Sequence, residues 1–190
     1  MYNEGIDRES IVPKIMGAVA AVGAVAGLAL IVMGLGFTEF LVVIACGLIA
    51  FICFVENEKE KEILMASLGI MIVAEILGFI FSDAKSATLF FNVFISIACH
   101  GGLLVYILGN WVDRSKAILA GGVLIADTIW RSVTFISVMG QYARVYDMLG
   151  GDAAELVALA KLSLVGVFVG IVPALAFTVL LFTGALDYGK

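Results

Sequence analysis

Charged residues are scarce in this chain. Asp, Glu, Lys and Arg make up 14% of its 190 residues, while 63% are hydrophobic and the mean hydropathy is +1.14. An average soluble domain is about a quarter charged. Apolar runs of about 20 residues recur along the whole length, and one soluble core of this size cannot bury them all. The composition therefore excludes an ordinary soluble domain and indicates an all-α membrane protein with several transmembrane helices.

Basic clusters, paired cysteines and catalytic motifs are also missing. The formal net charge is −5, and no cluster of Lys or Arg offers nucleic acid an electrostatic partner. The 3 cysteines form no CxxC pair and are typical of small buried side chains. A single histidine excludes haem ligation by two histidines of the chain, and no zinc spacing or hydrolase, metalloprotease or phosphate-loop motif occurs. We expect no catalytic residue, no metal, no cofactor and no enzymatic activity.

Six apolar stretches are long enough to cross a hydrocarbon layer of about 30 Å. The predicted spans are residues 15–36, 38–55, 63–82, 87–111, 115–140 and 162–185. Most connections between them are short, so successive spans run antiparallel and lie side by side. No stretch has the composition of a soluble domain. We therefore expect residues 1–190 to form a single bundle of six transmembrane helices.

The longest connection, residues 141–161, has a pattern of its own. Gly150 and Gly151 interrupt it, and Asp152 then precedes Glu155 by the spacing of a helix N-cap and its reciprocal partner. Apolar residues follow at helical spacing. The segment is therefore either a short amphipathic helix at the membrane interface or the beginning of a longer last span.

The basic residues are divided unequally between the two ends of the predicted bundle. With the N-terminus in the cytoplasm, seven of them are cytoplasmic and three are on the opposite side. The seven are Arg8, Lys14, Lys59, Lys61, Arg114, Lys116 and Lys190, and the three are Lys85, Arg144 and Lys161. Because cytoplasmic loops carry an excess of Lys and Arg, we expect a multi-pass membrane protein with both termini in the cytoplasm.

Small residues recur at four-residue spacing in the first and last spans. Such faces let two helix backbones approach closely. The candidate packing residues are Gly17, Ala20, Gly23, Ala24, Gly27, Gly166 and Gly170. The helix that they contact is either another span of this chain or part of a second protein. Pro173 lies inside the last span, where a proline usually kinks the helix, and the kink is either a hinge or a fixed bend.

Four Asp, Glu, His or Arg residues lie well inside the predicted spans, away from their ends: Glu75, His100, Asp127 and Arg131. An Asp or Arg at the bilayer centre costs about 2.5–3.5 kcal/mol on insertion scales, so we expect these side chains to face the bundle interior and to find partners. Their positions along the spans place His100 level with Asp127. Glu75 is level with Arg131, which also follows Asp127 by four residues on one helix face. We expect one polar cluster.

This cluster has two interpretations. It is either a structural clasp that fixes helix register, or a proton or ion site near the membrane midplane. The first interpretation suits a non-catalytic subunit of a membrane complex, surrounded by lipid and bound to other membrane proteins or to copies of itself. The second suits a small transporter or channel for protons, ions or small solutes. The absence of recognisable chemistry and the small-residue faces favour the subunit.

Overall fold

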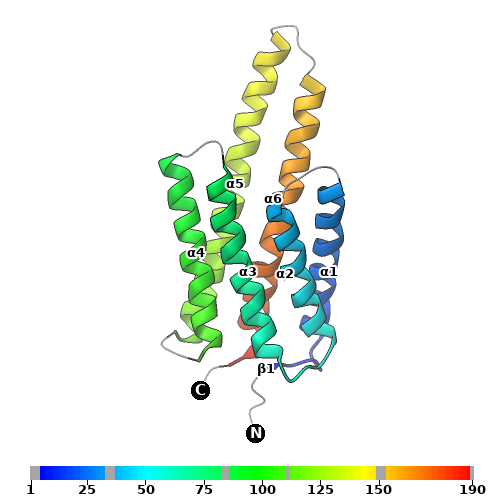
Figure 1. The fold of residues 1–190 in the computed structure, drawn as a ribbon, viewed down its shortest axis with the longest axis vertical. Helices are drawn as coiled ribbons and strands as arrows, with labels where there is room; N and C mark the ends of the chain where they lie inside the picture. The colour runs from blue at the N-terminus through cyan, green and yellow to red at the C-terminus, as the bar shows by residue number, and fades with distance from the viewer. Residues whose placement is uncertain (1–4, 33–36, 83–85, 110–111, 149–152, 189–190) are drawn as a thin grey trace.

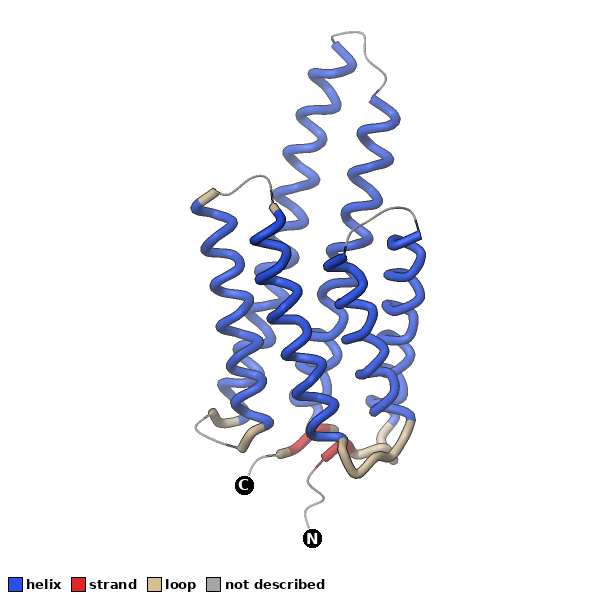
Figure 2. The backbone as a smooth tube through the Cα atoms, viewed as in Figure 1, coloured by secondary structure: helices blue, strands red, loops and turns tan. Residues whose placement is uncertain are grey.

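The computed structural model describes residues 5–32, 37–82, 86–109, 112–148 and 153–188, and most of them are helical. The elements in chain order are β1 (Gly5–Ile6), α1 (Ile11–Val32), α2 (Phe37–Phe54), α3 (Glu60–Phe81), α4 (Ala87–Ile107), α5 (Arg114–Met148), α6 (Ala153–Thr183) and β2 (Leu186–Asp187). The six helices form an up-and-down bundle, and both termini lie at the same end (Figure 1). There β1 and β2 pair antiparallel (Figure 2). The predicted all-α bundle is confirmed.

Five of these helices are long and apolar enough to cross a membrane, and α2 is apolar but shorter. Helix α6 is central, because it packs against α1, α2 and α5. Half of its most apolar window is buried inside the bundle, against 11% for α5. The remaining helices turn large apolar side chains outward, among them Val22, Phe90, Phe94 and Trp130. This distribution suits a bundle whose outer surface contacts lipid.

The ends of the helices follow local sequence signals. Helix α1 begins at Ile11, before the predicted residue 15, because the Ser10 hydroxyl accepts a hydrogen bond from the Val12 N–H at 3.3 Å. Pro13 lies in the first turn, where a missing N–H costs nothing. At the other terminus, Gly184 has a left-handed backbone (φ 79°), which lets the chain leave α6 and enter β2.

Helices α5 and α6 are longer than predicted. Residues 141–148 continue α5, and residues 153–161 begin α6, so the described part of 141–161 contains no separate amphipathic helix. The alternative expectation, a longer last span, describes α6 correctly. Gly150, Gly151 and Asp152 lie outside the described residues. At 1.5 Å per residue, α5 is about 52 Å long, and the α5–α6 hairpin projects beyond the other four helices (Figure 1).

The small residues of α1 pack against other helices of the same chain. A Cβ atom added to Gly17 would lie 2.7 Å from Cβ of Cys53 in α2. One added to Gly23 would lie 3.2 Å from Val172 of α6, and one added to Gly27 would lie 2.5 Å from Val43 of α2. The sequence left two partners open for this face, another span of the chain or a second protein. In the structure the face contacts other spans of the chain.

The other candidate packing positions are less tightly enclosed. Ala20 is fully buried and Ala24 is half-buried. A Cβ atom on Gly166 would make an ordinary 3.8 Å contact with Leu30 of α1. One on Gly170 would meet no atom within 4 Å. Gly170 is therefore not required for close packing, and the space beside it is part of a pocket described below.

Pro173 is buried within α6, and the helix continues on both sides of it. A proline at this position leaves the carbonyl of Val169, four residues earlier, without its helical donor. The thiol of Cys46 in α2 points to that oxygen, with Sγ 4.0 Å away. A neighbouring helix thus supplies a weak donor for the carbonyl that proline frees, as membrane helices often require.

Candidate functional site

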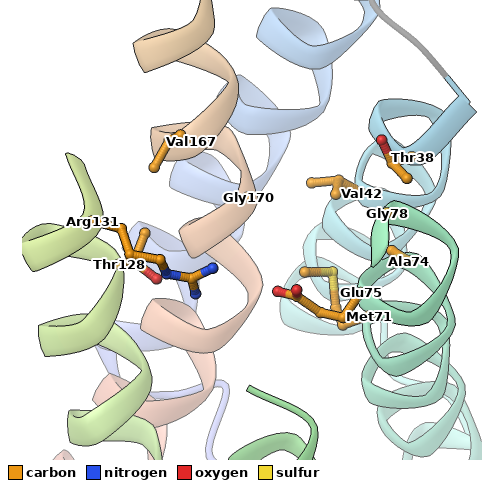
Figure 3. A pocket seen from close by; sticks show the side chains of 10 residues that line it. All are labelled: Thr38, Val42, Met71, Ala74, Glu75, Gly78, Thr128, Arg131, Val167 and Gly170. Atoms are coloured by element: carbon orange, nitrogen blue, oxygen red, sulfur yellow. The ribbon is translucent and has the colours of Figure 1, made fainter. Parts of the chain in front are cut away.

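A pocket of about 280 Å³ lies between α2, α3, α5 and α6. Its lining residues are Thr38, Val42, Met71, Ala74, Glu75, Gly78, Thr128, Arg131, Val167 and Gly170. Thr38 is in the first turn of α2 and Gly78 is in the last turn of α3, so the pocket extends to the rim of the bundle opposite the termini. Glu75 and Arg131 point toward each other from opposite walls (Figure 3).

Helix α5 brings Asp127 and Arg131 together on one face. Arg131 Nη2 lies 2.7 Å from Asp127 Oδ2, an ion pair formed at the predicted i,i+4 spacing. The two atoms are close, yet Asp127 Oδ2 and Arg131 Nε are both buried without a hydrogen bond of good geometry to any described residue. The structure therefore shows an ion pair within one helix, formed between side chains one turn apart.

Ser96 of α4 connects Glu75 to His100. The Ser96 hydroxyl donates a hydrogen bond of 2.9 Å to Glu75 Oε1. One turn later, His100 Nδ1 lies 2.9 Å from the Ser96 carbonyl oxygen, which can only accept, so Nδ1 carries a proton. His100 Nε2 is buried and finds no hydrogen-bond partner among the described residues. A neutral His100 therefore keeps one buried acceptor atom free.

The expected cluster is rearranged in one respect. Arg131 does face Glu75, but across the pocket, and its ion pair is with Asp127. His100 and Asp127, expected at the same level of the bundle, form no hydrogen bond with each other, because His100 Nδ1 bonds Ser96 and Nε2 has no partner among the described residues. The positions of Glu75 and Arg131 along their helices predicted that the two side chains face each other. Which groups each side chain bonds depends on how the helices are rotated about their axes.

The pocket combines few polar groups with apolar walls. The carboxylate of Glu75 and the guanidinium of Arg131 are its charged groups, Thr38 and Thr128 supply hydroxyls, and the other lining residues are apolar or glycine. Within the described residues, no three His, Cys, Asp or Glu side chains gather closely enough to hold a metal ion. A small pocket with apolar walls and a few convergent polar groups is typical of a solute-binding site.

A second polar cluster closes the end of the bundle where the termini lie. Glu60 accepts hydrogen bonds from the Ile6 N–H at 2.8 Å and from the Tyr188 hydroxyl at 2.9 Å, and it forms an ion pair with Arg8. Arg8 also donates to the carbonyl oxygen of Ile52 at 2.9 Å. We call Arg8, Glu60 and Tyr188 the terminal clamp, because they tie both ends of the chain to α3.

The electrostatics of the terminal clamp favour the protonated form of the Tyr188 hydroxyl. Burial, and then the negative charge of Glu60, raise the pKa of Tyr188 above its ordinary value. The Lys61 ammonium lies 5.8 Å from the centre of the Tyr188 ring, within range of a cation–π interaction. Near neutral pH, Tyr188 therefore remains a hydrogen-bond donor to Glu60.

Sequence reasoning missed several of these residues. Ser96 precedes His100 by four residues, so a search for polar residues on the same helix face would have found it. Glu60 and Arg8 were indistinguishable from solvated loop charges, because their contact joins residues 52 positions apart. Tyr188 is still further along the chain, and no local pattern indicates its bond to Glu60.

No known protein family, curated protein or solved structure matches this chain. The function is therefore inferred from the residues of the chain itself.

Proposed function

We propose that this protein is a small membrane transporter that binds a small solute or ion in the pocket between α2, α3, α5 and α6. The observation that carries the proposal is the opposition of Glu75 and Arg131 across a pocket of about 280 Å³. A structural clasp would bring these groups into contact, since buried charges are stable when paired. Arg131 is already paired with Asp127, so the gap leaves the carboxylate of Glu75 available to an occupant.

The position of the pocket supports transport. It reaches the rim at one end of the bundle, while the terminal clamp and the β1–β2 pairing close the other end. A transporter exposes its site to one side of the membrane at a time. The uneven distribution of Lys and Arg supports cytoplasmic termini, so the pocket would face the opposite side in this conformation.

The proposal is tested with the purified chain in liposomes. Imposed gradients of protons, alkali cations and small organic solutes should each be followed with wild-type protein and with Glu75→Gln. Gln keeps an oxygen that can accept the Ser96 hydrogen bond but removes the charge. Glu58→Gln, in the exposed α2–α3 connection, is the matched control. We expect flux with wild type and the control, and its loss with Glu75→Gln. Equal flux in all three samples, or none in wild type, would contradict the proposal.

The projecting α5–α6 hairpin favours a second candidate, a subunit of a membrane complex. A helix about 52 Å long exceeds a hydrocarbon layer of about 30 Å by some 20 Å when upright. Near its end, Tyr142, Val145, Tyr146 and Met148 all expose apolar surface. Exposed apolar residues on a projecting hairpin suit contact with another protein.

Native mass spectrometry of protein extracted gently from its own membrane separates the two candidates. A subunit would come out with other proteins in a fixed ratio, and that association would weaken when Val145 and Met148 are replaced by Ser. A transporter that works by itself would come out alone or as a homo-oligomer, and those replacements would leave its flux unchanged.

A further inference from the structure

The charges around the pocket do not balance. Asp127 and Arg131 neutralise each other at 2.7 Å. Glu75 accepts a hydrogen bond from Ser96, and none of the ion pairs between described residues includes it. Glu75 is therefore the carboxylate that lines the pocket, and no ion pair among the described residues engages it. An ionised carboxylate in a low-dielectric interior is stable when it is paired, so an occupant with one positive charge completes the site.

The residues that line the pocket indicate whether this positively charged occupant is a metal ion or an organic molecule. Hard metal cations take about six or more oxygen ligands, and the pocket offers one carboxylate and the hydroxyls of Thr38 and Thr128. Val42, Met71, Ala74 and Val167 present apolar surface to the same space. One carboxylate among apolar side chains suits an organic ammonium group, because the apolar walls can contact its substituents while the carboxylate faces its charge. The volume of about 280 Å³ lies just below the about 300–1,000 Å³ usual for ligand pockets, so the molecule is small.

We propose that the pocket binds a small organic monocation, with Glu75 as its counter-charge. Arg131 on the opposite wall is already paired with Asp127, so Glu75 is the lining group left to pair with the ligand. A zwitterionic ligand is disfavoured, since its carboxylate would compete with Asp127 for Arg131 and the site would retain its net negative charge. This inference rests on the proposed function and specifies the substrate class of the same pocket.

Binding of choline and of glycine betaine to the purified protein in detergent tests the inference. The two probes share a trimethylammonium group, but choline is a monocation and betaine is a zwitterion. We expect choline to bind and betaine to bind at least tenfold more weakly. Glu75→Gln should weaken choline binding by about 10- to 100-fold, the usual range for losing a charged partner. Glu58→Gln should leave it unchanged, and the thermal unfolding of each variant shows that it is folded.

A double variant, Asp127→Asn with Arg131→Gln, separates the cation from the zwitterion. It keeps the net charge of the pocket but removes the guanidinium. Choline binding should remain within about threefold of wild type, because Glu75 is still present. Preferential binding of betaine that the double variant abolishes would overturn the inference and leave the proposed function standing.

Competition with inorganic cations tests whether the pocket prefers an organic cation to a metal cation. Displacement of choline by equimolar sodium or potassium would assign a metal cation and contradict the organic class. Failure of choline, methylammonium and tetraethylammonium alike to bind would also overturn the inference. The liposome experiment then decides the proposed function separately, since flux of a different solute that depends on Glu75 would still support a transporter.

Discussion

The contact between α1 and α2 provides a stringent test of the packing. Gly17 faces Cys53, and an added Cβ would lie 2.7 Å from Cβ of Cys53 and 2.9 Å from the ring of Phe54. Cβ of Cys53 is fixed to the backbone, so Gly17→Ala forces the helices apart. Overpacking of this kind typically costs about 1–3 kcal/mol. Gly47→Ala, on the same helix pair but with no atom within 4 Å of the added Cβ, is the matched control.

Both substitutions gain about 1 kcal/mol of helix propensity, so the difference between them isolates the overpacking. For a chain of this size, 1 kcal/mol shifts the unfolding temperature by about 2–4 °C. We therefore expect Gly17→Ala to unfold about 2–12 °C below Gly47→Ala when purified alone in detergent and followed by tryptophan fluorescence. Equal unfolding temperatures would show that α1 does not pack on α2 through Gly17. A second protein would then be the better candidate for the partner of this face.

Three further perturbations probe the polar clusters. Glu60→Gln removes the counter-charge of Arg8 and should lower the free energy of unfolding by about 1.5–3 kcal/mol, measured by denaturant titration, whereas the exposed Glu62→Gln should have little effect. The raised pKa of Tyr188 favours its protonated form in the folded state. Its contribution to stability is therefore complete below about pH 10 and is lost as the pH rises through the raised pKa; Tyr188→Phe should abolish this alkaline dependence in thermal unfolding. Asp127→Asn leaves Arg131 unpaired and should cost about 1–3 kcal/mol, less than for a fully buried pair because Arg131 is 31% exposed. Adding Arg131→Gln should restore most of that loss, and a double variant as unstable as Asp127→Asn would refute the pairing.

The sequence predicted the class of the fold because long apolar runs leave few alternatives. It did not predict how far α5 and α6 continue. Residues 141–148 and 153–161 are helical but mixed in polarity, and a hydropathy pattern records where a helix suits lipid rather than where it ends. The same limit explains why the pattern of residues 141–161 left two alternatives open, of which the longer last span describes α6.

The polar site was predicted in part for a similar reason. The i,i+4 contact of Asp127 with Arg131 is local and follows from helix geometry. The contact of Glu75 with Ser96 depends on how α3 and α4 are rotated against each other, which no short pattern specifies. The terminal clamp is the extreme case, since Tyr188 and Glu60 are 128 positions apart. Long-range contacts of this kind depend on the packed bundle.

The most direct test of the account is to fill the pocket without removing any charge. Gly170 lines the pocket, and a side chain there would meet no atom within 4 Å at its Cβ. Gly170→Leu should therefore fold as well as wild type and abolish choline uptake into liposomes. Gly101→Leu, on α4, has equal room at its Cβ but does not line the pocket, and should keep its uptake. Undiminished uptake by a correctly folded Gly170→Leu would contradict the claim that solute passes through this pocket.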